Sequence, residues 1–296
     1  LGGDRSGLAV AWVGALCPAL TTVASNQGGG SEAPYLLLVL SGLWLALLTT
    51  RRRGAAAWAG ALGAGLCTGL AYLMRPEGIF FAVVFVPVVA VGALGGVAAL
   101  RRRSGATRRW GAAAVLVALF GVGLVACAGP YVDYLHTRTG SWQLTAKARD
   151  ASLDAWRAVA EHDRRARDQI FYRLDDDRES FVAGRYTLAE LVRDDPAGYA
   201  GIVGVNLRTA AREIARPEFL PYPSWELLPL PLMLLGGWAA WRRRRRAPAL
   251  AVLATGVVAL AVPLGFFVQP RYLAPTVAIA CVFVGLGLTD LPVRWR

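Results

Sequence analysis

Five charged residues lie near the ends of long apolar stretches: Glu32, Arg75, Glu77, Lys147 and Arg271. A charged side chain at bilayer depth is costly, so such residues often mark a polar cavity or an ion pair. The alternative is that these long side chains reach to the membrane interface and only anchor the protein there. Arg75 and Arg271 each stand in a tight turn between two apolar stretches, which favours a function for this pair.

The composition predicts the class of protein in which these charged residues lie. Of the 296 residues, 55% are hydrophobic, and the mean hydropathy is +0.43. The apolar residues form runs that approach the ~20 residues a helix needs to cross a bilayer. This excludes a soluble cytoplasmic enzyme, a disordered chain and a secreted disulfide scaffold. The formal charge of +12 comes from arginines between apolar runs. That pattern reflects membrane topology rather than nucleic-acid binding.

The sequence therefore predicts an all-α polytopic membrane protein with about eight transmembrane helices. The eight apolar segments are Leu8–Ala24, Tyr35–Thr50, Ala55–Met74, Ile79–Leu100, Trp110–Gly129, Phe219–Trp241, Ala247–Val268 and Tyr272–Thr289. We divide the chain into residues 1–129 with five spans, an outer segment 130–226, and residues 227–296 with three spans and a tail.

The connections between the segments alternate in charge. One set contains sixteen arginines and two acidic residues, a net charge of +14, and includes Arg51–Arg53, Arg101–Arg103 and Arg242–Arg246. The other set contains the remaining sixteen basic and eighteen acidic residues, a net charge of −2. Cytoplasmic loops carry the excess of Lys and Arg, so we expect both ends of this chain in the cytoplasm and residues 130–226 outside.

The outer segment is expected to contain amphipathic helices. Ala146–Ile170 has apolar residues on one face, and Asp194 and Asp195 before Pro196 predict the start of another helix. In that helix the apolar positions are Tyr199, Val203, Leu207, Ala210 and Ile214, and the basic positions are Arg208, Arg212 and Arg216. Such a helix either lies in the headgroup plane or covers a small soluble core with a solvated face.

The other reactive residue types indicate no soluble catalytic motif. The four cysteines each lie within an apolar run and are expected to pack as small hydrophobic side chains without disulfides. Asp175–Asp177 is interpreted as a solvated acidic turn. The sequence indicates no metal site and no cofactor, although it leaves a divalent metal possible.

Four short motifs occur in order along the chain, all on the predicted outer side. They are Ser-Glu-x-x-Tyr, Leu-x-Arg-Pro-Glu-Gly, Pro-Tyr-x-x-Tyr-Leu with the later Thr-Gly-x-Trp-x-Leu-Thr-x-Lys, and Pro-Arg-Tyr-Leu-x-Pro. In these motifs the chain resembles the C-type membrane glycosyltransferases that use polyprenyl-phosphate sugars, the group with protein O-mannosyltransferases and lipid A aminoarabinose transferases. The resemblance spans about Leu8 to Leu288.

The resemblance implies an enzyme of the cytoplasmic (inner) membrane whose site faces outward. Such an enzyme moves a sugar from a polyprenyl phosphate to a hydroxyl on protein, lipid or glycan. The resemblance assigns Arg75, Arg271 and Lys147 to the donor phosphate, because fixed cations stabilise the charge on a leaving phosphate. It assigns Glu32 or Glu77 to a catalytic or supporting role. Membrane lipids are further expected partners.

One departure from the family concerns its main acidic residue, which follows the first transmembrane helix. Here the first outer loop is Ser25–Pro34, and its Glu32 matches a later family position. We therefore expect a truncated chain, with the main catalytic base upstream of Leu1. Two other classes stay open: a transporter or flippase, which often has inverted repeats, and a non-catalytic membrane subunit. The sequence shows no repeat and no charged residue well inside a predicted span, and both observations count against the transporter.

Overall fold

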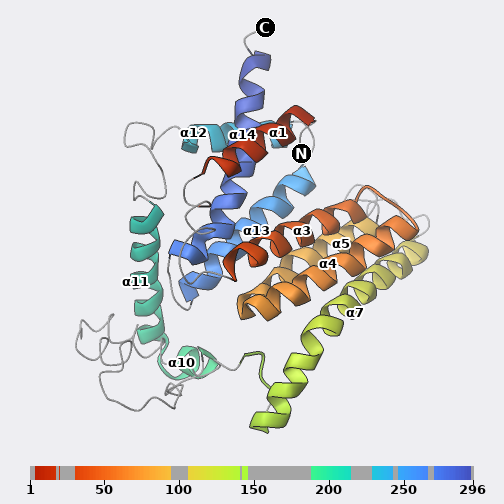
Figure 1. Cartoon of the computed structure of the whole chain (residues 1–296), viewed down its shortest axis with the longest axis vertical. Coiled ribbons are helices and arrows are strands. Elements are labelled where there is room, and N and C mark those ends of the chain that lie inside the picture. The colour runs from red at the N-terminus through yellow and green to blue at the C-terminus, as the bar shows by residue number, and fades with distance from the viewer. Residues whose placement is uncertain are drawn as a thin grey trace. The chain divides into compact units, whose positions relative to one another are not determined.

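The computed structural model describes residues 4–17, 20, 31–94, 106–140, 142–145, 188–214, 229–242, 246–265 and 270–294. Every regular element within these ranges is a helix, which confirms the predicted all-α class (Figure 1). Nothing in the sequence favours strands there, since the apolar runs are long and rich in alanine, leucine and glycine.

Five stretches of the described residues are long and apolar enough to cross a membrane. They are α3 (Glu32–Thr49), α4 (Ala55–Met74), the stretch Pro76–Ala93, the part Trp110–Thr139 of α7, and the part Ala247–Gly265 of α13. Pro76–Ala93 consists of a 3-10 turn, η1 (Pro76–Phe81), followed by α5 (Ala82–Ala93). These helices indicate a membrane-embedded protein, and they match five of the eight predicted segments.

The other three predicted segments are not confirmed as spans. They correspond to α1 (Asp4–Ala15), α12 (Pro229–Arg242) and α14 (Ala274–Arg294). The first two have 12 and 14 residues. The apolar part of α14 is Ala274–Thr289, also shorter than the spans above.

The chain divides into two compact units by its contacts. The first comprises residues 1–131, 217–259 and 274–296, and the second comprises residues 132–216 and 260–273. Each unit is described by itself below.

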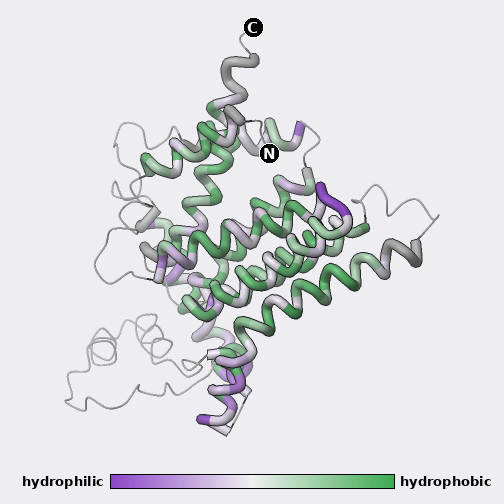
Figure 2. Tube along the Cα trace, turned by 45° about the vertical axis from the view of Figure 1, so that its right-hand side comes forward, coloured by the Kyte–Doolittle hydropathy of each residue, from purple (hydrophilic) through white to green (hydrophobic). Residues whose placement is uncertain are grey.

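In the first unit, α3, α4 and α5 pack as an antiparallel group. The α3–α4 turn carries Arg51–Arg53 and is hydrophilic, whereas the helices beside it are apolar (Figure 2). A Cβ atom added to Gly92 of α5 would lie 2.9 Å from Oγ1 of Thr49, so the end of α5 lies beside the arginine turn. The predicted side assignment requires this arrangement, because the residues after α5 also belong to the arginine-rich set.

Glycines bring α4 close to α7 (Ala106–Thr139). A Cβ atom at Gly65 would collide with the carbonyl of Phe120, and one at Gly123 would collide with the carbonyl of Leu62. Gly69 comes similarly close to Leu124. The contacts of Gly65 are with Phe120 and Leu124, and those of Gly69, one turn later, are with Leu124 and Cys127, so α4 and α7 run in the same direction, as the predicted alternation requires. Small residues permit such close approach between membrane helices.

Helix α7 is longer than its predicted apolar segment. Its 34 residues correspond to about 50 Å, more than the ~30 Å hydrocarbon thickness. The helix passes through Pro130, where the sequence predicts the outer segment to begin, and continues to Thr139. Proline inside a membrane helix is tolerated when neighbouring groups compensate the lost hydrogen bond.

Around α14 the contacts agree with the predicted topology for α1 but not for α12. The hydroxyls of Ser6 and Thr289 are hydrogen-bonded at 3.2 Å, and a Cβ atom at Gly285 would lie 2.6 Å from Val10, so α1 and α14 run in opposite directions, as predicted. Cβ atoms at Gly236 and Gly287 would collide with the carbonyls of Phe283 and Leu232, respectively. Helices α12 and α14 therefore run antiparallel. Strict alternation of eight spans predicts the same direction for these two helices.

In the second unit, α10 (Leu188–Asp194) is followed directly by α11 (Pro196–Ile214). The predicted helix start is confirmed. A carboxylate oxygen of Asp195 accepts a hydrogen bond from the backbone N–H of Gly198 at 2.9 Å, the contact that defines an N-cap. Proline at the first helical position fits because that position needs no N–H donor. Ala146–Ile170 and Asp175–Asp177 lie outside the described residues.

The buried face of α11 coincides only in part with the apolar positions of the sequence. Ile202, Asn206 and Ala210 are buried, whereas Leu207 is 56% exposed. The amide nitrogen of Asn206 donates a hydrogen bond of 2.9 Å to the carbonyl of Leu264, in the last turn of α13 (Arg246–Gly265). The side that carries Asn206 faces inward, and its amide satisfies a carbonyl at a helix end.

Candidate functional site

The first turn of α3 places Glu32 at one end of the helix group. Glu32 is the first helical residue, where the partial positive charge of the helix N-terminus favours a carboxylate. The hydroxyl of Ser31, the N-cap residue, donates to Oε2 of Glu32 at 3.5 Å. Only 3% of the Glu32 side chain is exposed. A buried carboxylate of this kind needs a partner of opposite charge.

The end of α4 supplies that partner. Helix α4 stops at Met74 because Pro76 disfavours helical backbone at the preceding residue. Arg75 accordingly has extended backbone, with φ −151° and ψ 126°. The carbonyl of Arg75 accepts a hydrogen bond of 2.8 Å from the N–H of Gly78, which closes the turn. This turn sends the chain back along α4 into η1 and α5.

Gly78 makes the turn possible at this closeness. A Cβ atom at this position would lie 2.5 Å from the backbone carbon of Ala71 and 2.5 Å from the backbone nitrogen of Tyr72. Both are backbone atoms of α4, which cannot rotate away as a side chain would. The glycine of the Leu-x-Arg-Pro-Glu-Gly motif is therefore required by packing, and it fixes the position of Arg75 and Glu77.

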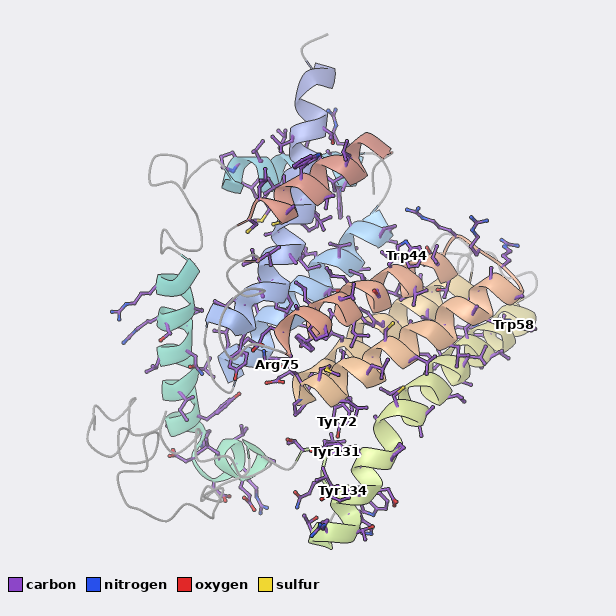
Figure 3. The ribbon with its side chains drawn as sticks, viewed as in Figure 1. Trp44, Trp58, Tyr72, Arg75, Tyr131 and Tyr134 are labelled. Atoms are coloured by element: carbon purple, nitrogen blue, oxygen red, sulfur yellow. The ribbon has the colours of Figure 1, made fainter. Side chains whose placement is uncertain are left out.

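Three charged side chains meet at this end. Nη1 of Arg75 lies 3.4 Å from Oε1 of Glu32, and Nε of Arg75 lies 3.9 Å from Oε2 of Glu77. The Arg75 side chain is 10% exposed and that of Glu77 is 37% exposed. We call these three residues the carboxylate–arginine cluster. Figure 3 shows Arg75 at the junction of α4 with η1, close to the start of α3.

Aromatic rings cover the cluster on its inner side. The guanidinium carbon of Arg75 lies 5.7 Å from the centre of the Tyr35 ring, a distance at which a cation is attracted to the face of an aromatic ring. Tyr35 in turn contacts Phe81, with ring centres 6.4 Å apart, and Phe81 stacks on Phe85 at 6.0 Å. This packing excludes water from one side of the guanidinium and strengthens its electrostatic interactions.

A second aromatic pair lies one turn before Arg75. The rings of Tyr72 and Tyr131 meet edge to face, with their centres 5.9 Å apart (Figure 3). Tyr131 is the tyrosine of the Pro-Tyr-x-x-Tyr-Leu motif, so the second and third motifs adjoin each other here. Tyr134, one turn further along α7, is 52% exposed.

The structure thus joins three of the five predicted site residues. Glu32, Arg75 and Glu77 come together although they belong to two separate motifs. The backbone of Arg271 lies in η2 (Pro270–Leu273), but its side chain is outside the described residues, as is all of Lys147. Their predicted roles stay predictions.

Sequence reasoning missed the aromatic neighbours. Tyr35 lies three residues after Glu32, and helical spacing places both on one face, so this contact carried a detectable signal. The contacts of Phe81 with Tyr35 and of Tyr72 with Tyr131 had no such signal. They depend on how α3, α4 and α7 pack together.

The cluster combines two carboxylates with one guanidinium, a net charge of −1 for these three side chains. Glu32 and Arg75 are buried and paired, so their positions are fixed. Glu77 is the most exposed member and the more loosely held carboxylate. In the described part of the chain, Oε2 of Glu77 makes no hydrogen bond. Glu77 is therefore the member best placed to exchange its partner or accept a proton.

Among the residues that the structure describes, no group of side chains could bind a metal ion. No three His, Cys, Asp or Glu side chains gather there as a metal ion would require. Comparison with protein families, with curated proteins and with solved structures gives no match. The interpretation of the site therefore depends on the four motifs and on the geometry of the carboxylate–arginine cluster.

Proposed function

We propose that the chain is the membrane part of a glycosyltransferase that transfers a sugar from a polyprenyl phosphate to a hydroxyl acceptor. The observation that carries this proposal is the meeting of two motifs at one point. The glutamate of Ser-Glu-x-x-Tyr and the arginine of Leu-x-Arg-Pro-Glu-Gly lie 3.4 Å apart, 43 residues apart in sequence.

The proposed reaction needs both charges of this cluster. The acceptor oxygen attacks the anomeric carbon, the bond from that carbon to the phosphate oxygen breaks, and the electron pair leaves with the polyprenyl phosphate. A carboxylate takes the proton from the acceptor hydroxyl, and a cation stabilises the charge that develops on the phosphate. We assign the phosphate to Arg75, whose planar fork matches phosphate oxygens, and a supporting role in the proton transfer to Glu77.

Glu77 and the phosphate then compete for the same guanidinium. In the resting site, Glu77 occupies the Nε side of Arg75 at 3.9 Å. A donor phosphate that arrives at Arg75 would displace this carboxylate and leave it beside the reacting atoms. Glu32 keeps its place, because it is buried and holds Arg75 from the Nη1 side. Glu32 is in this view a positioning residue.

We further propose that the site opens to the outer face of the cytoplasmic membrane. The cluster lies at the end of α3 and α4 opposite to Arg51–Arg53, and arginine-rich turns face the cytoplasm. Arg271 and Lys147 are the further cations proposed for the phosphate.

Binding of polyprenyl phosphate tests this function. The protein in lipid nanodiscs is titrated with polyprenyl phosphate and, as a control, with the unphosphorylated polyprenol of equal length. We expect saturable binding of the phosphate only. Glu77→Gln should tighten this binding, because the competing negative charge is removed. Arg75→Gln should weaken binding.

The burial of Arg75 also favours a second candidate, a non-catalytic membrane subunit. In that case the ion pair with Glu32 serves only to hold α3 against α4, and the Glu77→Gln variant has no effect on phosphate binding. Equal binding of polyprenyl phosphate and polyprenol by the native chain and by Glu77→Gln would support the subunit and overturn the enzyme.

A further inference from the structure

Helix α11 carries an exposed apolar stripe that no described residue covers. At about 100° per residue, positions 200, 204, 207 and 211 fall on one side of a helix. They are Ala200, Gly204, Leu207 and Ala211. Leu207 is 56% exposed, the two alanines are exposed, and a Cβ atom at Gly204 would meet no atom within 4 Å.

Two arginines border this stripe. Arg208 and Arg212 are exposed and follow Leu207 and Ala211 directly in sequence. They lie one turn apart on the same side of the helix. The opposite side of α11 is the buried one, with Ile202, Asn206 and Ala210. The helix therefore has a buried apolar side, an exposed apolar stripe and a basic edge next to that stripe.

A hydrogen bond fixes where α11 lies. Asn206 binds the carbonyl of Leu264, which is in the last turn of the apolar stretch Ala247–Gly265. Tyr199 adds a second contact, since its hydroxyl lies 3.0 Å from where a Cβ atom of Gly265 would stand. Because α13 is long and apolar enough to cross the bilayer, we place its last turn at the membrane boundary, together with the middle of α11 that contacts this turn.

We propose that the exposed stripe of α11 inserts into the lipid surface and that Arg208 and Arg212 bind the headgroups of anionic phospholipids. In a fully solvated helix, a stripe of four apolar positions stays in water and contributes no favourable free energy. At a lipid surface, however, the stripe is removed from water and the adjoining arginines meet phosphate oxygens. This proposal depends on membrane embedding and not on the glycosyltransferase.

The test measures where the stripe lies in the intact chain. A fluorescent probe is attached at Ala211→Cys in a variant whose four native cysteines are replaced by alanine. The protein is placed in nanodiscs of phosphatidylcholine, with or without phosphatidylglycerol. Nitroxide-labelled lipid quenches a probe in the lipid surface, and iodide quenches a probe in water. A probe at Ala189→Cys, exposed on α10, is the control position.

We expect quenching by the lipid nitroxide at position 211 but not at 189, with an increase when phosphatidylglycerol is present. The double variant Arg208→Gln, Arg212→Gln should lower the equilibrium constant for insertion of the stripe into the lipid surface by about one order of magnitude. Arg193→Gln, at an exposed arginine of α10, is the matched control and should change nothing. Equal iodide quenching at both positions overturns the proposal. If quenching by the lipid nitroxide is the same with and without phosphatidylglycerol, and the same in the double arginine variant, the assignment of anionic headgroups is overturned.

Discussion

Nη1 of Arg75 lies 3.4 Å from Oε1 of Glu32, and both side chains are at least nine-tenths buried. The contact joins the start of α3 to the end of α4. A buried ion pair contributes little net stability when compared with apolar residues of the same shape. Loss of one partner is a different matter, because the other charge then stays buried without compensation.

This asymmetry predicts the behaviour of single and double variants. Arg75→Ala should lower the free energy of unfolding by about 3–5 kcal/mol, because the buried carboxylate of Glu32 loses this ion pair. Combining Arg75→Met with Glu32→Gln should restore most of that loss. Thermal unfolding in nanodiscs, compared across the single and double variants, measures the difference. A double variant no more stable than Arg75→Ala would contradict a pairwise origin of the effect.

The turn between α4 and η1 should not accept a side chain at Gly78. Gly78→Ala places a methyl group 2.5 Å from two backbone atoms of α4, and overpacking of this kind costs about 1–3 kcal/mol. It should also weaken polyprenyl phosphate binding, because the turn that carries Arg75 must move. Unfolding and phosphate titrations of the same variant check both effects. Unchanged stability would mean that η1 can shift away from α4 without cost.

Two glycines of α7 provide a matched pair for helix packing. A Cβ atom at Gly123 meets backbone of α4, with the nitrogen of Leu66 at 2.8 Å, whereas one at Gly121 meets nothing within 4 Å. Gly123→Ala should lower the unfolding temperature. Gly121→Ala should leave it unchanged or raise it, because alanine favours a helix by about 1 kcal/mol over glycine. Equal effects of the two substitutions would show that α7 does not pack on α4 through Gly123.

Much of this arrangement could be predicted from the sequence. The long apolar runs predicted the all-α class and five of the segments that are long enough to span a membrane. Glu32 and Arg75 could be predicted to share a side, because a two-helix hairpin returns the end of α4 to the start of α3. Their direct contact could not, since it depends on the rotation of each helix about its axis.

Two other features could not be predicted from the sequence, for physical reasons. The continuation of α7 through Pro130 depends on compensation by neighbouring groups, which local preference does not encode. The buried side of α11 includes Asn206, a polar residue that an apolar pattern does not mark. Its hydrogen bond to Leu264 joins residues 58 positions apart, which the sequence pattern does not reveal.

The packing of α11 against the last turn of α13, which we call docking, should weaken at alkaline pH. Burial raises the pKa of Tyr199 above its ordinary value of about 10. The docked state therefore holds the neutral phenol more tightly than the undocked one. The contribution is complete below pH 10 and is lost as the pH rises through the raised value. The probe at position 211 should report this loss, and Tyr199→Phe should remove the dependence on pH.

Asn206 offers the sharpest test of how α11 is held. Its amide nitrogen donates to Leu264, whereas Oδ1 is buried and has no hydrogen-bond partner within the described residues. Asn206→Asp would place a carboxylate against a carbonyl without solvent, so α11 should detach and lose protection from hydrogen exchange. Asn206→Leu removes the donor but also the unsatisfied oxygen, so most protection should remain. Detachment in both variants would mean that the hydrogen bond itself, and not the packing around it, carries the docking.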